Sequence, residues 1–181
     1  VLICQLATPP VAQQEDIDKS RQTAITYSIE KISNSVVGIN VTQLKKQQVN
    51  PFFDPFWGGF FPYTRTFKME NMGSGVLVSP DGYIVTNTHV VDNAMEIVVT
   101  LKGGKSYDAQ LVGVDNLTDI ALVKIDDNNL PFAVLGDSDQ LIVGEWAIAL
   151  GNPLGLFDVN HQPTATAGII SGIEMDFGLK E

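Results

Sequence analysis

The 181-residue chain is long enough to bury one small β-barrel and part of a second. Its hydrophobic content of 44% against 18% charged residues excludes a long disordered chain and indicates a globular protein. The net charge of −10 is uneven, because residues 105–181 carry three Lys or Arg against twelve Asp or Glu. Such a surface repels phosphate backbones, so nucleic acid is not expected as a partner.

Residues 1–14 open with the apolar Val1-Leu2-Ile3, without an initiator Met, and continue into a run rich in Ala and Pro. This pattern is typical of the end of a secretory signal peptide, with a disordered leader as the alternative. The single Cys4 cannot form an intrachain disulfide. The signal-peptide pattern therefore predicts an extracytoplasmic protein. No run approaches the roughly 20 apolar residues of a membrane span, so no integral membrane segment is expected, and both ends look cut.

Residues 15–33 are predicted to form a short N-terminal helix, because Ile25, Ile29 and Ile32 recur along one face. The run 36–42 is predicted as the first strand. The segment 51–67, PFFDPFWGGFFPYTRTF, holds eight of the fifteen aromatic residues together with three Pro and two Gly. Because proline at this density opposes helices and central strands, a long loop over 45–70 is predicted. Its aromatic side chains either fold back on the barrel or form an interaction surface.

Short strands follow in close succession, joined by turn sequences such as Ser79-Pro80-Asp81-Gly82. They are predicted at 73–79, 83–91, 96–101, 106–115 and 119–125. After a linker at 131–140, two more strands are predicted at 145–150 and 165–173. The fold class is therefore all-β, with the helix and a complete first barrel over 15–135. The linker and a second, truncated barrel occupy 136–181, since two strands cannot close a barrel.

His89 and Asp119 are the candidate catalytic pair. His89 lies in a polar cluster at the end of a predicted apolar strand. Asp119 begins an apolar run that continues to Ile125, and we expect this run to draw the Asp119 carboxylate out of water. A histidine at the mouth of the same barrel would be its hydrogen-bond partner. A carboxylate on Nδ1 fixes the imidazole tautomer and leaves Nε2 free to act as a base toward a serine hydroxyl.

Several motifs occur in an order that resembles HtrA/DegP-type serine proteases over residues 25–178. They are Gly73-Ser74-Gly75-Val76, Thr86-Asn87-Thr88-His89-Val90-Val91, Thr118-Asp119-Ile120-Ala121, Gly136-Asp137-Ser138, Gly144-Glu145-Trp146 and Gly151-Asn152-Pro153. The resemblance implies the chymotrypsin-like double barrel, with His89 as general base and Asp119 as its orienting acid. It further implies a periplasmic endopeptidase that degrades unfolded or misfolded proteins, assembles as homotrimers or higher oligomers, and carries PDZ domains. Thr88 stands where the family often has Asn.

The family's nucleophile motif, Gly-Asn-Ser-Gly-Gly, is absent from these 181 residues. Ser138 lacks the following glycines, Ser171 lies in a predicted strand, and Ser74 is interpreted as a structural strand residue. None is assigned as nucleophile, so this chain is expected to be inactive alone. A non-catalytic chaperone or pseudo-protease on the same fold is the alternative function.

His161 is expected to lie exposed in a polar loop between the last two predicted strands. Two histidines 72 positions apart, with no paired cysteines, do not make a zinc site. No glycine-rich loop opens a helix, so no nucleotide cofactor is expected. The sequence therefore predicts neither a metal nor a cofactor.

Overall fold

The computed structural model describes residues 21–53, 60–152 and 157–173, and the expected leader at 1–14 lies outside them. The elements are α2 (Ala24–Ile32), β1 (Val36–Phe53), β2 (Phe60–Leu77), β3 (Tyr83–Asn87), α3 (Thr88–Val91), β4 (Ala94–Thr100), β5 (Ser106–Asp115), β6 (Ile120–Ile125), a 3-10 turn (Ser138–Gln140), β7 (Trp146–Gly151), α4 (Phe157–Asn160) and β8 (Thr164–Ile169). The predicted helix is confirmed over α2. It begins in a capping box in which the Thr23 hydroxyl accepts from the backbone N–H of Thr26.

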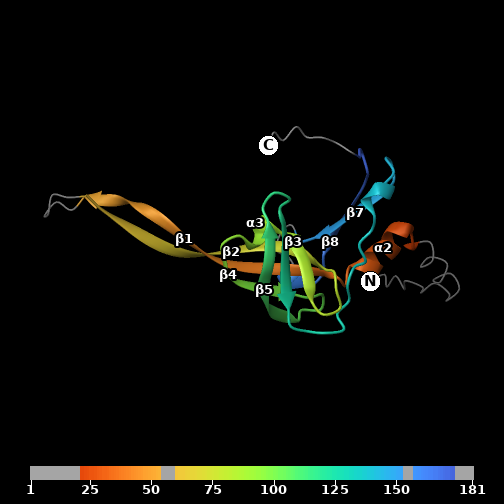
Figure 1. Ribbon diagram of the computed structural model, residues 1–181, viewed down its shortest axis with the longest axis horizontal. Helices are drawn as coiled ribbons and strands as arrows, with labels where there is room; N and C mark the ends of the chain where they lie inside the picture. Colours follow the sequence, from red (N-terminus) through yellow and green to blue (C-terminus); the bar gives the residue numbers. More distant parts are fainter. Residues whose placement is uncertain (1–20, 54–59, 153–156, 174–181) are drawn as a thin grey trace, which may run out of the picture.

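The first barrel is closed, as predicted, with the strand order β1-β2-β3-β6-β5-β4 and antiparallel pairing throughout (Figure 1). Alternate side chains point inward, and Val37, Ile39 and Val41 of β1 are buried beside Val123 and Ile125 of β6. The predicted turn at 79–82 joins β2 to β3. On this barrel the end of β3 and the start of β6 lie side by side.

The prediction of a long loop over 45–70 is wrong. β1 and β2 pair from Val36 opposite Val76 as far as Phe53 opposite Phe60, and they extend beyond the barrel as a two-stranded ribbon (Figure 1). We call residues 43–53 and 60–72 the β1–β2 arm. Proline excludes central strands, but beyond Gln43 the outer edge of β1 is not paired with β4. Pro51 also falls at the register shift between Val49 and Phe52, where a missing N–H donor interrupts no ladder.

The last described strands, β7 and β8, form a separate two-stranded sheet that pairs Trp146 with Ile169 at one end. Trp146 remains 67% exposed, and every residue of β8 is exposed. Residues that follow β7 contact the first barrel: the Asn152 N–H donates to the Ser74 hydroxyl at 2.6 Å, and the fully buried Phe157 of α4 packs against Gly38. An apolar sheet left this open is typical of part of a larger barrel.

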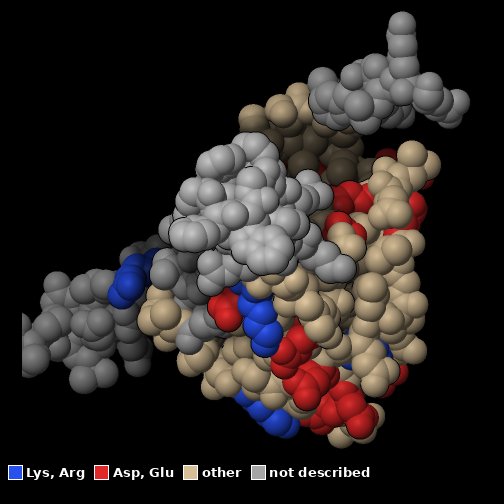
Figure 2. All heavy atoms as spheres, turned by 90° about the vertical axis from the view of Figure 1, so that its left-hand side faces the viewer, with Lys and Arg blue, Asp and Glu red and all other residues tan. Residues whose placement is uncertain are grey.

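The net negative charge of the chain is visible on its surface (Figure 2). On the face shown in Figure 2, several acidic side chains lie next to one another, while Lys and Arg are more scattered. Among the described residues, no helix is long and apolar enough to cross a bilayer.

Candidate active site

His89 is positioned by a sharp change of direction at the end of β3. The sequence predicts a strand over 83–91, but β3 ends at Asn87 and His89 lies in the single turn of α3. Beyond the end of β3, the buried Thr88 bonds across to the start of β6: its hydroxyl donates to the Ile120 carbonyl at 2.9 Å, and its N–H to the Asp119 carbonyl at 3.1 Å. These bonds fasten the histidine-bearing turn to the segment that carries Asp119.

Asp119 precedes β6 by one residue and has a left-handed backbone with φ of 56°. This conformation is uncommon for residues other than glycine, and Asp and Asn tolerate it best. The Asn87 side-chain amide donates to the Asp119 carbonyl at 3.1 Å and to its Oδ2 at 3.2 Å. The strained backbone turns the carboxylate away from the strand and toward α3.

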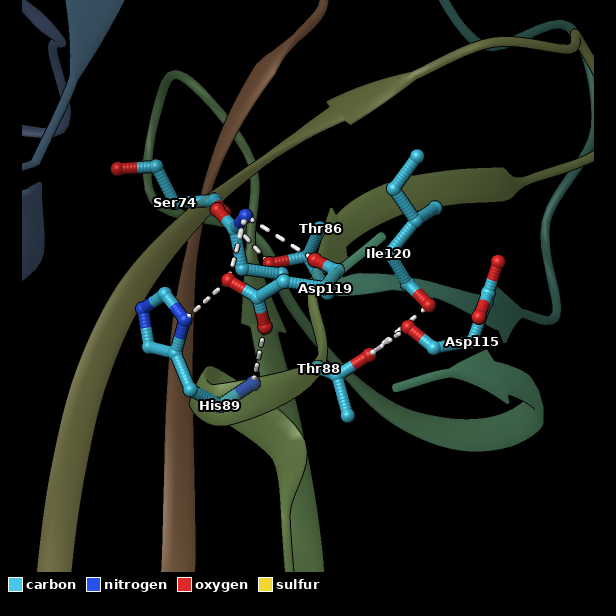
Figure 3. A network of polar contacts seen from close by, with 8 residues as sticks. Ser74, Thr86, Thr88, His89, Asp115, Asp119 and Ile120 are labelled. Carbon is cyan, nitrogen blue, oxygen red and sulfur yellow. Dashed lines mark hydrogen bonds and ion pairs between the residues drawn. The ribbon is translucent and has the colours of Figure 1, made fainter. Parts of the chain in front are cut away.

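The side chains of His89 and Asp119, the pair predicted from the sequence, are in direct contact. His89 Nδ1 lies 2.6 Å from Asp119 Oδ2, and the His89 backbone N–H donates to Asp119 Oδ1 at 3.0 Å (Figure 3). Both carboxylate oxygens therefore engage the same residue, which fixes the imidazole in position and orientation. A carboxylate at Nδ1 favours the tautomer with its proton there and leaves Nε2 as the basic nitrogen.

The Asp119 carboxylate is stabilised by hydrogen bonds and is not withdrawn from water as expected. Its side chain is 43% exposed and that of His89 is 70% exposed. The buried part of the apolar run begins only at Ala121, since Ile120 is itself half exposed. The pKa of Asp119 is held below its ordinary value, first by the N–H of His89 and also by the imidazole and the Asn87 amide. The group is therefore an anion at neutral pH, as an orienting acid must be.

None of the three serines considered in the sequence lies in hydrogen-bond contact with His89 in the described structure. The Ser74 hydroxyl accepts the N–H of Asn152, and its carbonyl accepts the Thr86 hydroxyl at 2.7 Å, which fits a structural strand residue. Ser138 begins the 3-10 turn capped by the Asp137 side chain. Ser171 follows β8, which ends at Ile169, so its predicted strand position is wrong.

His161 is half-buried, which corrects the expectation of an exposed loop residue. α4 turns the chain back, and the His161 N–H donates to the Phe157 carbonyl at 2.8 Å. A Cβ added at Gly104 would lie 3.0 Å from its Nε2, so the ring packs on the β4–β5 turn, away from Asp119. No group of three or more His, Cys, Asp or Glu within the described ranges could hold a metal ion.

Two features of the site are missing from the sequence-based interpretation. Asn87 and Thr88 enter it only as neighbours of His89, yet they join the segments that carry His89 and Asp119, and Ser74 links the barrel to the second sheet. The signal for the first is present, since two short polar side chains at the end of an apolar strand must find partners. Nothing in the sequence places Ser74 beside Asn152, 78 positions away.

Comparison with known proteins gives concordant matches. The family described as "Trypsin-like peptidase domain" matches residues 73–179. The "Probable periplasmic serine endoprotease DegP-like" of Chlamydia muridarum is 52% identical over 175 residues, covering 91% of this chain and 32% of the relative. A protein of the same name from Halomonas elongata is 50% identical over 106 residues, covering 59% of this chain and 21% of the relative.

Solved structures agree with these matches. The chain is similar to the HtrA-type protease AlgW with decapeptide, with a TM-score of 0.66 and 35% identity over 87% of this chain and 48% of that one. It is also similar to the serine endoprotease of Yersinia pestis, with a TM-score of 0.62 and 31% identity over 84% and 46% of the two chains. The chain therefore spans less than half the length of these relatives.

Proposed function

Because this chain belongs to the trypsin-like peptidase family, in its HtrA/DegP branch, we propose that it is part of a serine endopeptidase whose general base is His89 and whose orienting acid is Asp119. The observation that carries the proposal is the double contact between the Asp119 carboxylate and His89. It leaves Nε2 as the basic nitrogen, and the imidazole is exposed enough to meet a second group.

The mechanism requires a serine hydroxyl within reach of His89 Nε2. We infer that this serine, with the N–H groups that stabilise the oxyanion, belongs to a part of the protein outside these 181 residues. His89 takes the hydroxyl proton as the serine attacks the peptide carbonyl and returns it to the leaving amine. Asp119 stays ionised throughout and stabilises the imidazolium that forms between the two steps.

We propose unfolded or misfolded polypeptides in the bacterial periplasm as substrates. The name of the relative from Chlamydia muridarum supports the compartment, and the structure of AlgW with decapeptide supports a peptide as ligand. The exposure of His89 also fits an unfolded substrate. An unfolded polypeptide can reach the imidazole directly, whereas a folded domain would need a surface that matches the site.

The test is hydrolysis of unfolded casein by the full-length protein. We expect turnover that a fluorophosphonate abolishes, and no turnover by the 181-residue chain alone. A full-length protein that binds casein and prevents its aggregation, yet neither cleaves it nor reacts with the reagent, would be a chaperone on this fold and would contradict the proposal.

We further propose that the β1–β2 arm makes contacts between subunits in a homotrimer or larger oligomer. The arm projects beyond the barrel (Figure 1), and its described part leaves Leu44, Met69 and Met72 exposed. Replacing 51–63, part of which lies outside the described residues, with a short Gly/Ser linker should leave the melting temperature nearly unchanged. Light scattering should show a smaller oligomer. A large fall in melting temperature with an unchanged oligomer would mean that the replaced residues belong to the core and do not join subunits.

A further inference from the structure

A polar pocket of about 330 Å³ borders His89 on the side of the arm. Three carboxamides, one cation and one carboxylate line it beside the imidazole and a single apolar side chain. Its lining residues other than His89 are Gln43, Leu44, Lys45, Asn71, Asp92 and Asn93. Nothing in the proposed roles of His89 and Asp119 uses these groups.

The walls of the pocket are held by fixed contacts. Gln43 is only 7% exposed, and its Nε2 donates to the Asp92 carbonyl at 2.5 Å, which ties the base of the arm to the end of α3. Asn93 has a left-handed backbone and donates from Nδ2 to the Asp92 carboxylate at 2.7 Å. Asn71 is held in β2 opposite Val41. These contacts hold part of the pocket in place before a ligand binds, which lowers the cost of ordering it.

The chemistry at His89 indicates what passes this pocket. In acyl transfer by a serine, the protonated imidazole gives its proton to the leaving amine, so that amine lies against the histidine. The residues that follow the broken bond must then continue past the imidazole. The turn 115–119 occupies the other flank of His89, where Asp119 binds Nδ1 and Leu117 is almost fully exposed. The side of His89 toward the β1–β2 arm therefore remains open to these substrate residues, and it is polar.

We propose that this pocket is the subsite for the first two substrate residues after the scissile bond, and that it selects polar, uncharged side chains there. The inference rests on the proposed peptidase function. Lys45 and Asp92 carry opposite charges on its walls, so neither an acidic nor a basic side chain gains a clear advantage. A large apolar side chain would cover the three carboxamides without bonding to them, which is unfavourable.

The experiment uses the full-length protein and peptides that differ only at the first or second position after the cleaved bond, carrying Gln, Leu, Glu or Lys. We expect kcat/KM for Gln to exceed that for Leu by about 3- to 10-fold at one of these positions, the range of one or two hydrogen bonds. The same four residues placed before the cleaved bond serve as the internal comparison.

Asn71→Leu should remove or reverse the preference for Gln, because it replaces a pocket carboxamide with an apolar side chain. Gln110→Leu makes the same change on the exposed surface of β5 and should preserve the preference. If Asn71→Leu does not fold, Lys45→Leu at the exposed rim provides a second variant, expected to weaken discrimination between Gln and Leu.

The outcomes separate the two proposals. Equal kcat/KM for all peptides, or a preference unchanged by Asn71→Leu and Lys45→Leu, overturns the subsite while leaving the peptidase intact. A preference that appears only before the cleaved bond also overturns it. Cleavage of no peptide, together with no reaction with a fluorophosphonate, overturns the peptidase and the subsite together.

Discussion

Asp119→Asn in the full-length protein is expected to lower kcat for casein-derived peptides by about 10⁴. The amide cannot hold the imidazole in the tautomer that leaves Nε2 basic, because it would offer an N–H where the carboxylate accepts one. Asn also tolerates the left-handed backbone at this position, so the fold should be unaffected. His89→Ala should abolish turnover, since no base remains within reach of a serine hydroxyl.

Asp115→Asn is the matched control for this prediction. Asp115 belongs to the same turn, and its carboxylate accepts from the Leu117 N–H at 2.9 Å and the Thr118 hydroxyl at 2.8 Å without a bond to His89. Its pKa is also lowered, first by the Thr118 hydroxyl. Activity should fall no more than a few-fold. Comparable losses for Asp115→Asn and Asp119→Asn would mean that the turn, and not the contact with His89, determines the rate.

Gly82→Ala should destabilise the protein by about 3 kcal/mol or more, combining backbone strain with a steric clash. Gly82 has φ of 98°, and an added Cβ would lie 2.5 Å from the Ile125 carbonyl oxygen. That carbonyl belongs to β6, and the Ile125 N–H donates to the Gly82 carbonyl at 3.0 Å, so relief of the clash would pull apart the β2–β3 turn and the barrel wall.

Gly103→Ala isolates the backbone strain, and the difference between the two variants gives the steric part of the loss. Gly103 has nearly the same φ, 95°, but nothing lies within 4 Å of the added Cβ. Only the backbone strain should remain, about 1 kcal/mol. Urea unfolding of the two variants measures the difference in the free energy of unfolding. Equal losses would show that contact with Ile125 contributes nothing and that the conformation alone matters.

The sequence predicts the barrel well because its signals are local. Alternating apolar residues mark each strand, and the Ser79–Gly82 turn marks the connection between β2 and β3, so the strands can be found without knowing their partners; the closed barrel is confirmed. The β1–β2 arm escapes prediction because proline opposes a strand only where the neighbouring edge is paired. Which edges are paired depends on β4, whose Ala94 lies opposite Gln43 at the base of the arm.

The proposed catalytic pair also combines features that the sequence predicts with features that it does not. His89 and Asp119 are identified by residue type and motif, and the structure brings them to 2.6 Å. The exposure of Asp119 could not be predicted, because it depends on a left-handed backbone that places the carboxylate outside the barrel. The polar walls beside His89 come from β1, β2 and the end of α3, which only the folded chain assembles.

The most direct test of the catalytic assignment is to find where a fluorophosphonate attaches. The full-length protein is labelled, digested and analysed by mass spectrometry. We expect one modified serine outside these 181 residues, with labelling lost in His89→Ala and strongly slowed in Asp119→Asn. Modification of Ser74, Ser138 or Ser171, or labelling at an unchanged rate in His89→Ala, would contradict the assignment.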